Sequence, residues 1–320
     1  MPKGEPLVIA IDIGGTNLRV ALVDRDGRMS RREKSATITT RKGLVRQLAG
    51  IINRLKASEP GVRAVGIGFP GPLKIQEGII LTAPNLPQCH NLPLKKILER
   101  ETGLPVFVQN DANAAALGEY WIGAAKGAGS VICITLGTGI GGGIVLKGKI
   151  WEGAGDVAGE VGHVTVRPGG RKCGCGKRGC IETYASATGV ARSAREAVRR
   201  NKKSLLLPLA GGKPPAITSA IVYDAAVRGD RTAREVLAET GRILAEVIGS
   251  LINVLNPAMV VLTGGLSRAG RLLFGPLREE VPKHCFAVSL KGTRIVPGKL
   301  GDNAGLAGAA LFAFQNMENR

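Results

Sequence analysis

The sequence predicts an α/β protein of two domains, and three observations support that fold class. Short apolar runs typical of strands alternate with segments of helical periodicity, which favours a largely parallel sheet covered by helices. Two glycine-rich strand-turn-strand units recur, one at 7–23 and one at 131–146. A chain of 320 residues is also long enough to bury two hydrophobic cores.

The first of these units places glycines between two apolar runs. Residues 7–13 and 18–23 are the expected strands, and Asp12, Gly14, Gly15 and Thr16 lie at the turn. A phosphate loop of the G-x4-G-K-[ST] type is excluded, because no lysine follows the glycines and no helix begins there. Successive backbone N–H groups in a tight glycine turn can still hold phosphate oxygens.

The second unit repeats this arrangement with Gly137, Thr138 and Gly139 between strands at 131–136 and 144–146. Residues 137–142 match the dinucleotide fingerprint G-x-G-x-x-G. That fingerprint leads into a helix, whereas here a β-branched segment follows the glycines, so the match is misleading.

The remaining elements follow from periodicity and from turn residues. Strands are expected at 64–69, 105–109 and 259–262, the last ending in Gly264 and Gly265, which indicate either backbone approach to a ligand or only a tight turn. Helices are expected at 43–55, 94–102, 112–121, 189–201, 218–227, 232–255 and 303–314.

The net charge of +19 favours contact with polyanions such as nucleotide, polyphosphate or nucleic acid. The basic residues concentrate at 25–46 and 167–203. In the second segment Arg192, Arg195, Arg199 and Lys203 recur at helical spacing, which fits a solvated helix face as well as a binding surface. No targeting signal is visible, and the charge-free run 127–146 is too glycine-rich for a membrane span. We therefore expect a cytoplasmic protein without membrane contact.

Four side chains near the middle of the chain have the spacing of metal ligands. Cys173, Cys175 and Cys180 form C-x-C-x4-C among glycines, and His163 precedes them. Thiolate and imidazole suit zinc, and four such ligands can close a tetrahedral structural site. The alternatives are buried free thiols or a disulfide, although two cysteines separated by one residue pair poorly.

Asp111 is the candidate general base, because it stands where an expected strand ends and a helix begins. A carboxylate there is rigidly held, and the helix dipole keeps it ionised. The alternative is that Asp111 is simply the helix N-cap. Glu182 likewise has a simple interpretation, that it begins a helix and interacts with its dipole.

The motif C-G-C-G-x2-G-C-x-E-x3-S at 173–186, together with G-E-x-G-H at 159–163, resembles the signature of the ROK family of sugar kinases and related repressors. The resemblance implies the two-lobed actin-like sugar-kinase fold with a cleft between the lobes. The small lobe would comprise residues 1–112 and a returning C-terminal helix, 303–320. The large lobe would comprise residues 113–302 and carry the zinc loop.

The resemblance also implies roles for individual residues. Asp111 would be the catalytic base. The sugar ligands would be Asn85, Asn110, Asp111, Glu160, His163 and Glu182, with His163 shared between sugar and a structural Zn²⁺ held by Cys173, Cys175 and Cys180. For ATP, Gly14, Gly15, Thr16, Gly137, Thr138 and Gly139 would hold phosphates, Gly264 and Gly265 would border adenosine, and Asp12 would lie near Mg²⁺.

The implied activity is ATP-dependent phosphorylation of glucose at its 6-hydroxyl, because Q-N-D-A-N-A-A-A-L-G-E-Y at 109–120 is similar to the glucokinase branch. Kinases of N-acetylglucosamine or N-acetylmannosamine are the alternative within the family. A sugar-responsive repressor is disfavoured, because such proteins carry an N-terminal DNA-reading module and this chain reaches its first strand at Leu7. We expect a homo-oligomer, a dimer or a tetramer. The donor is left open among ATP, ADP and polyphosphate.

Overall fold

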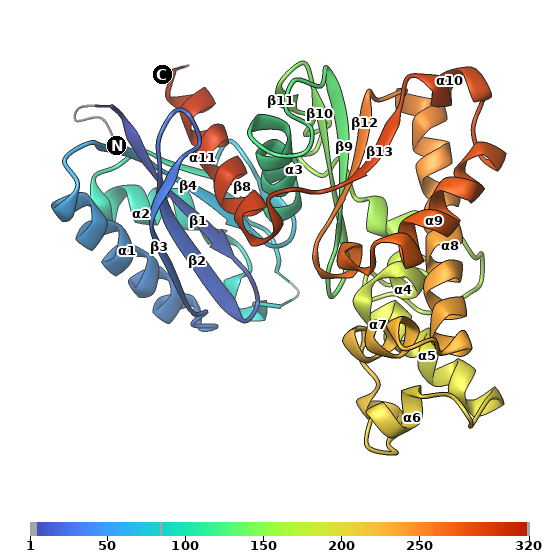
Figure 1. Cartoon of the computed structure of the whole chain (residues 1–320). Coiled ribbons are helices and arrows are strands. Elements are labelled where there is room, and N and C mark those ends of the chain that lie inside the picture. Colours follow the sequence, from blue (N-terminus) through green and yellow to red (C-terminus); the bar gives the residue numbers. More distant parts are fainter. Residues whose placement is uncertain (1–4, 84, 319–320) are drawn as a thin grey trace. The chain divides into compact units, whose positions relative to one another are not determined.

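The computed structural model describes residues 5–83 and 85–318 (Figure 1). These residues divide into two compact units. Unit 1 runs to Cys133, resumes over Gly143–Gly159 and resumes again from Lys299 onwards. Unit 2 comprises Ile134–Gly142 and Glu160–Gly298. Both units are therefore assembled from separate stretches of the chain.

Unit 1 is built on a five-stranded sheet in the order β3-β2-β1-β4-β8. Its strands are β1 (Leu7–Ile13), β2 (Asn17–Val23), β3 (Met29–Ala36), β4 (Val62–Phe69) and β8 (Val106–Asn110). The first three strands pair antiparallel, whereas β1, β4 and β8 pair parallel. The expectation of a largely parallel sheet is corrected here, because consecutive strands joined by tight turns must run antiparallel.

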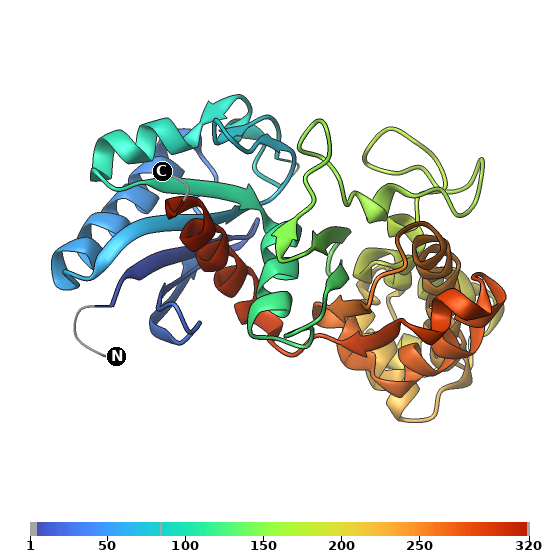
Figure 2. The ribbon, with the colours of Figure 1, turned by 90° about the horizontal axis from the view of Figure 1, so that it is seen from above.

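Helices cover both faces of this sheet (Figure 2). One face carries α1 (Arg41–Ser58) and α2 (Leu94–Thr102). The other carries α3 (Asp111–Trp121) and α11 (Ala304–Met317), which pack against each other and against β4. The Ala- and Gly-rich sequence of α11 makes this close packing possible, and most of its side chains are buried.

The boundary between the units differs from the one expected between residues 112 and 113. Because α3 packs on α11 and β4, it belongs to unit 1, as does the segment 143–159. The return of the chain to the first unit begins at Lys299 rather than at Asn303.

A small three-stranded sheet in unit 1 follows β4, in the order β5-β6-β7. Its strands are β5 (Leu73–Lys74), β6 (Ile79–Ile80) and β7 (Leu92–Pro93), and all of them pair antiparallel. The loop between β6 and β7 carries Asn85 and the short helix η1 (Pro87–Cys89).

The second five-stranded sheet has the order β11-β10-β9-β12-β13. Its strands are β9 (Ser130–Leu136), β10 (Ile140–Leu146), β11 (Lys149–Ile150), β12 (Met259–Thr263) and β13 (Arg294–Pro297). The division between the units falls inside β9 and β10, so the glycine turn that joins them belongs to unit 2.

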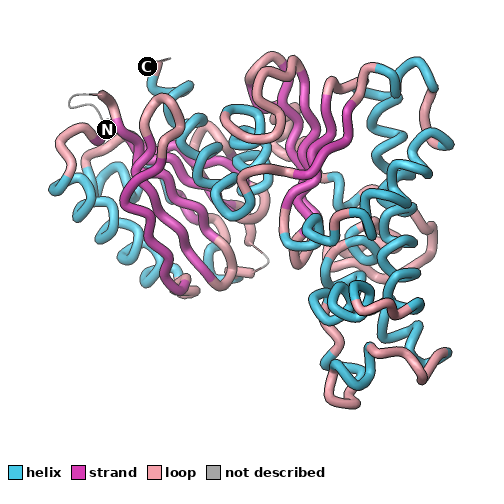
Figure 3. The backbone as a smooth tube through the Cα atoms, viewed as in Figure 1, coloured by secondary structure: helices cyan, strands magenta, loops and turns pink. Residues whose placement is uncertain are grey.

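Helices make up most of unit 2 (cyan in Figure 3). They are η2 (Val161–His163), α4 (Glu182–Ala185), α5 (Ala187–Arg200), α6 (Leu206–Leu209), η3 (Pro214–Ala216), α7 (Ser219–Val227), α8 (Arg231–Leu255), η4 (Gly265–Ala269), α9 (Arg271–Glu280), η5 (Val281–Lys283) and α10 (Ala287–Lys291). The crossover back to unit 1 contains η6 (Gly301–Asn303). As its apolar stripe predicts, α8 buries one face, and it ends at Asn256 in the left-handed conformation. Among the described residues, none of the helices is long and apolar enough to cross a membrane.

Candidate active site

Asp111 is the first residue of α3, at the point where β8 ends. The N-cap of that helix is Asn110, whose Oδ1 accepts the N–H groups of Ala112 at 2.9 Å and Asn113 at 3.2 Å. The alternative that Asp111 itself is the cap is therefore wrong. Asp111 lies instead inside the first turn, where a carboxylate interacts favourably with the dipole of α3.

Asp12 and Asp111 lie at the same edge of the first sheet. Asp12 pairs with Gly68 across β1 and β4, and Gly68 pairs with Gln109 across β4 and β8. Since β1, β4 and β8 run parallel, their carboxyl ends meet at one edge, which is where ligands bind in open α/β sheets.

The side chain of Asp12 is mostly buried, with 18% of its surface exposed, and its carboxylate lies near the guanidinium of Arg19. Its Oδ2 lies 3.5 Å from a guanidinium nitrogen of Arg19, which also contacts Asp302 at 3.1 Å. Burial raises the pKa of Asp12 to about 6, and the charge of Arg19 opposes that rise. A divalent cation would stabilise the ionised form of a carboxylate whose pKa burial has raised, so Asp12 is a candidate to lie near Mg²⁺.

The first glycine turn is closed by a hydrogen bond from the N–H of Gly14 to the carbonyl of Asn17, 2.9 Å long. Gly15 faces the loop that carries Asn85, because a Cβ at Gly15 would lie 2.8 Å from the Cβ of Asn85. Thr16 is exposed. Unit 1 thus places a predicted sugar ligand against a predicted phosphate turn.

The second glycine turn, in unit 2, is tied to the helix that follows the cysteine cluster. The N–H of Gly137 donates to the carbonyl of Gly139 at 3.0 Å, and Thr188 donates its hydroxyl to the carbonyl of Thr138 at 2.8 Å. The N–H of Ile140 donates to Oε2 of Glu182 at 2.9 Å. A side chain at Gly139 would clash with that carboxylate.

His163, Cys173, Cys175 and Cys180 come together as their spacing predicts. Their ligand atoms all lie within 4.8 Å of one another. The Sγ atoms of Cys175 and Cys180 are 3.7 Å apart, and Sγ of Cys173 is 3.7 Å from Nδ1 of His163. These separations are too long for a disulfide, and all the cysteines are free. They match the edge of about 3.8 Å of a tetrahedron whose ligands lie about 2.3 Å from zinc.

Metal binding at the cysteine cluster would be coupled to the release of thiol protons. Burial raises the pKa of the Cys173 thiol to about 12 and also raises that of Cys180. A bound Zn²⁺ would displace these protons, because the thiolate is the metal ligand.

The two ring nitrogens of His163 face different partners. Nδ1 faces Cys173, whereas Nε2 lies 3.8 Å from a carboxylate oxygen of Glu160. A metal on Nδ1 would fix the tautomer and leave Nε2–H as a donor. Cys173 also lies 3.8 Å from Oε1 of Glu182. Of the residues expected at the sugar, His163 is therefore part of the cluster, and Glu160 and Glu182 adjoin it.

Gly264 and Gly265 follow β12 and begin η4. Gly264 has a positive φ of 91°, and its carbonyl accepts the hydroxyl of Ser267 at 2.7 Å. Of the predicted residues, Asp12, Gly14, Gly15, Thr16, Asn85, Asn110 and Asp111 therefore belong to unit 1. The others, Gly137, Thr138, Gly139, Glu160, His163, Cys173, Cys175, Cys180, Glu182, Gly264 and Gly265, belong to unit 2.

The structure adds Arg19, Gln109, Glu152 and Asp302 to the surroundings of Asp12 and Asn110. Sequence reasoning missed these residues. Gln109 and Glu152 are far apart in the sequence, so no local motif connects them. Arg19 lies on a strand whose periodicity indicates only which residues are buried.

The predicted basic face on the helix after the cysteine cluster is wrong in part. Lys203 lies beyond the end of α5 at Arg200. Arg195 is partly buried and donates to the carbonyl of Ile217 at 2.8 Å, and Arg192 pairs with Glu196 at 3.0 Å. These arginines therefore serve local structure rather than one continuous cationic surface. Val190, Ala194 and Val198 form the buried face of α5.

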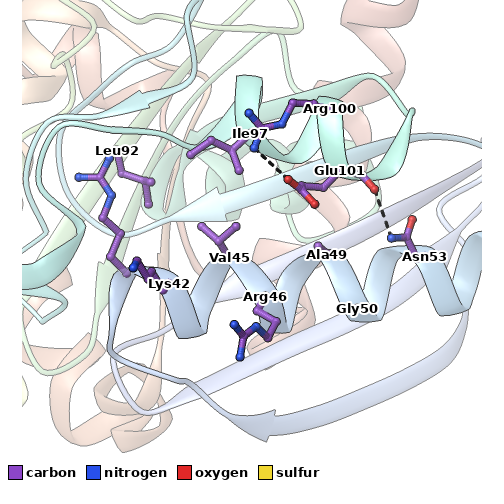
Figure 4. A pocket seen from close by; sticks show the side chains of 11 residues that line it. Lys42, Val45, Arg46, Ala49, Gly50, Asn53, Leu92, Ile97, Arg100 and Glu101 are labelled. Carbon is purple, nitrogen blue, oxygen red and sulfur yellow. Dashed lines mark hydrogen bonds and ion pairs between the residues drawn. The ribbon is translucent and has the colours of Figure 1, made fainter.

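A groove of about 470 Å³ lies between α1 and α2 in unit 1 (Figure 4). Val45, Ala49 and Ile97 line it together with the basic residues Lys42 and Arg46. None of the predicted site residues lines this groove, so it is separate from the candidate active site.

A sequence profile of the ROK family matches residues 8–316. The glucokinase of Thermotoga maritima is 39% identical over 312 residues, which cover 97% of each chain. The N-acetyl-D-glucosamine kinase of Vibrio cholerae is 34% identical over 312 residues, which cover 94% of this chain and 97% of the relative.

Among solved structures, a ROK family glucokinase from Streptomyces griseus in complex with glucose and AMPPNP matches with a TM-score of 0.84 and 38% identity. The match covers 97% of this chain and 99% of that protein. The two-lobed sugar-kinase fold inferred from the sequence motifs is thereby confirmed.

Proposed function

This chain belongs to the ROK family, and on that premise we propose that it is an ATP-dependent glucokinase. It transfers the γ-phosphoryl group of ATP to the 6-hydroxyl of glucose and releases glucose 6-phosphate and ADP. The observation that carries the proposal is the similarity to glucokinases over nearly the whole chain. The arrangement of Asn110 and Asp111 at the start of α3 supports it.

Phosphoryl transfer asks the protein mainly for position and charge. In the proposed reaction Asp111 accepts the proton of the 6-hydroxyl as the bond to phosphorus forms. Asn85, Asn110, Glu160, His163 and Glu182 hold the hydroxyls of the sugar, and these acceptors and donors would be left unpaired by the wrong epimer. The proposal therefore requires groups from both units.

The backbone N–H groups of the two glycine turns would hold the phosphates of ATP, and Gly264 and Gly265 would border its adenosine. Mg²⁺, when bound, neutralises charge on the transferred phosphoryl group, and Asp12 is the carboxylate that would hold it, directly or through water. In this proposal Zn²⁺ on His163, Cys173, Cys175 and Cys180 is structural. It has four protein ligands and leaves no position for a reacting water.

The test is a panel of glucose, mannose, N-acetylglucosamine and N-acetylmannosamine against ATP, ADP and inorganic polyphosphate. We expect the highest kcat/KM with glucose and ATP. A higher value with N-acetylglucosamine would favour the alternative, which the relative from Vibrio cholerae supports. If the protein phosphorylates none of these sugars with any donor, the proposed kinase activity is wrong.

We propose further that the protein is a cytoplasmic homo-oligomer. Val254, Phe286 and Val288 are more than 70% exposed, and they lie on neighbouring segments, because Asn253 accepts the N–H of Phe286 at 2.9 Å. Exposed apolar side chains in one place are typical of an association surface. Light scattering measures the mass. A dimer or tetramer that dissociates in Val254→Glu/Phe286→Glu supports this surface, and a monomeric wild type contradicts it.

A further inference from the structure

A chain of two buried amides, Gln109 and Asn113, and one half-buried carboxylate, Glu152, adjoins the proposed catalytic residues of unit 1. Gln109 is fully buried and is the residue before Asn110. Its Oε1 accepts the N–H of Asn110 at 2.7 Å and the Nδ2 of Asn113 at 3.0 Å. Its Nε2 donates to Oε1 of Glu152 at 3.1 Å.

The partners of Gln109 dictate the orientation of its amide. The backbone of Asn110 offers only a donor on this side, so it requires the oxygen of Gln109. An ionised Glu152 can only accept, so it requires the nitrogen. Turning the amide over would place donor against donor at one end and acceptor against acceptor at the other. All three partners therefore favour the same orientation of the Gln109 amide, and Glu152 holds its nitrogen end.

Glu152 stands at the start of a loop that is held in place independently. Trp151 donates its N–H to the carbonyl of Ile144 at 2.7 Å, and Ala158 donates to the carbonyl of Glu152 at 3.0 Å. Asp156, in the left-handed region with φ of 59°, accepts the N–H of Ile75 at 3.1 Å. The loop is thus a rigid support for the Glu152 carboxylate.

We propose that Gln109 and Glu152 are positioning residues of the kinase reaction, which hold Asn110 and Asp111 in their productive geometry through the hydrogen-bonded Glu152–Gln109–Asn113 chain. The inference rests on the proposed function. Neither residue touches the reacting atoms. A base displaced by even about 1 Å loses much of its effect, which is why a residue behind it can control turnover.

The physical alternative is that the chain only stabilises the fold. Asn113 argues against that simple role, because its Oδ1 is buried without a hydrogen-bond partner among the described residues, so its amide is held through its nitrogen alone. Without the hydrogen bond to Gln109, the side chain of Asn113 would lose its anchor in the first turn of α3, two residues after Asp111. The effect would fall on the start of the helix that carries the base.

The test exchanges the two functional groups. Gln109→Glu places two carboxylates about 3 Å apart and removes the donor to Glu152, a like-charge contact that is strongly unfavourable. Glu152→Gln alone still offers an amide oxygen to Gln109. The double variant Gln109→Glu/Glu152→Gln restores a donor opposite an acceptor and keeps an oxygen toward Asn110 and Asn113.

We expect kcat with glucose to fall by roughly tenfold or more in Gln109→Glu, to change by less than about threefold in Glu152→Gln, and to recover to within about threefold of wild type in the double variant. The KM for ATP should stay within about twofold in all three, because the phosphates are assigned to the glycine turns. Gln47→Glu, the same substitution at a partly exposed amide on α1, should leave kcat unchanged.

Wild-type kcat in Gln109→Glu, or a double variant no better than that single variant, would overturn the proposal. A loss of stability with unchanged kcat would assign the chain to folding alone and would overturn it equally. If the wild type phosphorylates no sugar, the proposed function fails. The positioning chain is then tested by urea unfolding of the same four proteins and by hydrogen exchange at the amide of Asn110. Additive unfolding energies with unchanged exchange would overturn it.

Discussion

The carboxylate of Glu182 accepts a hydrogen bond of 2.9 Å from the backbone N–H of Ile140. This contact connects a proposed sugar ligand to the glycine turn proposed for phosphate, and both belong to unit 2. The residue that would hold the acceptor substrate is therefore also a structural partner of the turn that would hold the donor.

From this contact we expect Glu182→Ala to weaken both substrates. The KM for glucose should rise at least about tenfold, and the affinity for a non-hydrolysable ATP analogue measured without sugar should fall as well, because the N–H of Ile140 loses its acceptor. Glu160→Gln is the matched control, since its described partner is His163. It should weaken glucose alone. If Glu182→Ala binds the nucleotide analogue as tightly as wild type, Glu182 does not support the phosphate turn and the prediction is wrong.

The cysteine cluster leads us to expect one zinc per chain in the purified protein, measured by atomic emission. Cys175→Ala removes one of four ligands, so zinc content and thermal stability should both fall, and the KM for glucose should rise because Glu182 adjoins the cluster. Zinc affinity should also weaken as the pH is lowered, since binding releases thiol protons. A metal-free protein of full activity would exclude this role.

Asp111→Asn is expected to lower kcat by roughly a thousandfold or more, because the proton of the sugar hydroxyl loses its acceptor. Stability and glucose binding should change little, since Asn110 and not Asp111 caps α3. Calorimetric titration with glucose provides the check on binding. Turnover above about a tenth of the wild-type rate would mean that another group accepts the proton.

The raised pKa of the mostly buried Asp12 predicts that the stability of the protein depends on pH. Its pKa rises from 3.8 to about 6 in the folded state, so the folded protein binds the proton more tightly than the unfolded chain does. The contribution of Asp12 to the free energy of unfolding is therefore fully present below about pH 4 and is lost as the pH rises through about 6.

Asp12→Asn removes that titration. Compared with wild type in magnesium-free buffer, it should be more stable by about 1–2 kcal/mol at pH 7.5 and nearly equal at pH 4, while kinase activity is lost. Urea unfolding at the two pH values measures this. A difference that stays constant between them would contradict the assignment to Asp12.

Glu119, fully buried in α3, accepts the N–H groups of Ala124, Lys299 and Leu300 at 2.8–3.0 Å. It thereby holds the crossover that returns the chain to unit 1. Glu119→Leu should cost about 3 kcal/mol or more of unfolding free energy, because buried donors lose a charged acceptor. Glu33→Gln, which breaks an exposed ion pair with Arg54, should cost less than about 1 kcal/mol. Equal costs would show that the crossover does not depend on Glu119.

The sequence predicts those parts of the molecule whose signals are local. Apolar runs around the glycine turns predict β1, β2 and β9, and the ends of α2 and α8 follow from Gly103 and Asn256. The spacing of Cys173, Cys175 and Cys180 is sufficient to predict that these thiols come together, because short loops join them.

Other features have no local signal. The strand β3 carries the sequence MSRREKSA and is mostly exposed, so it has no apolar alternation, and pairing with β2 alone makes it a strand. The helix α9 contains Pro276, which argues against a helix in sequence terms. The contact between Gln109 and Glu152 joins residues far apart in the chain and depends on how β8 and the loop after β11 pack.

The discontinuity of unit 1 has a consequence for biosynthesis. The sheet of β1, β4 and β8 needs α11 on one face, yet α11 is translated only after the whole of unit 2. At 5–20 residues per second, the ribosome takes roughly 10–40 s to make the intervening chain. During that interval the apolar strands of the nascent sheet lack the cover of α11, so we expect nascent unit 1 to bind chaperones that recognise such strands until α11 emerges from the exit tunnel.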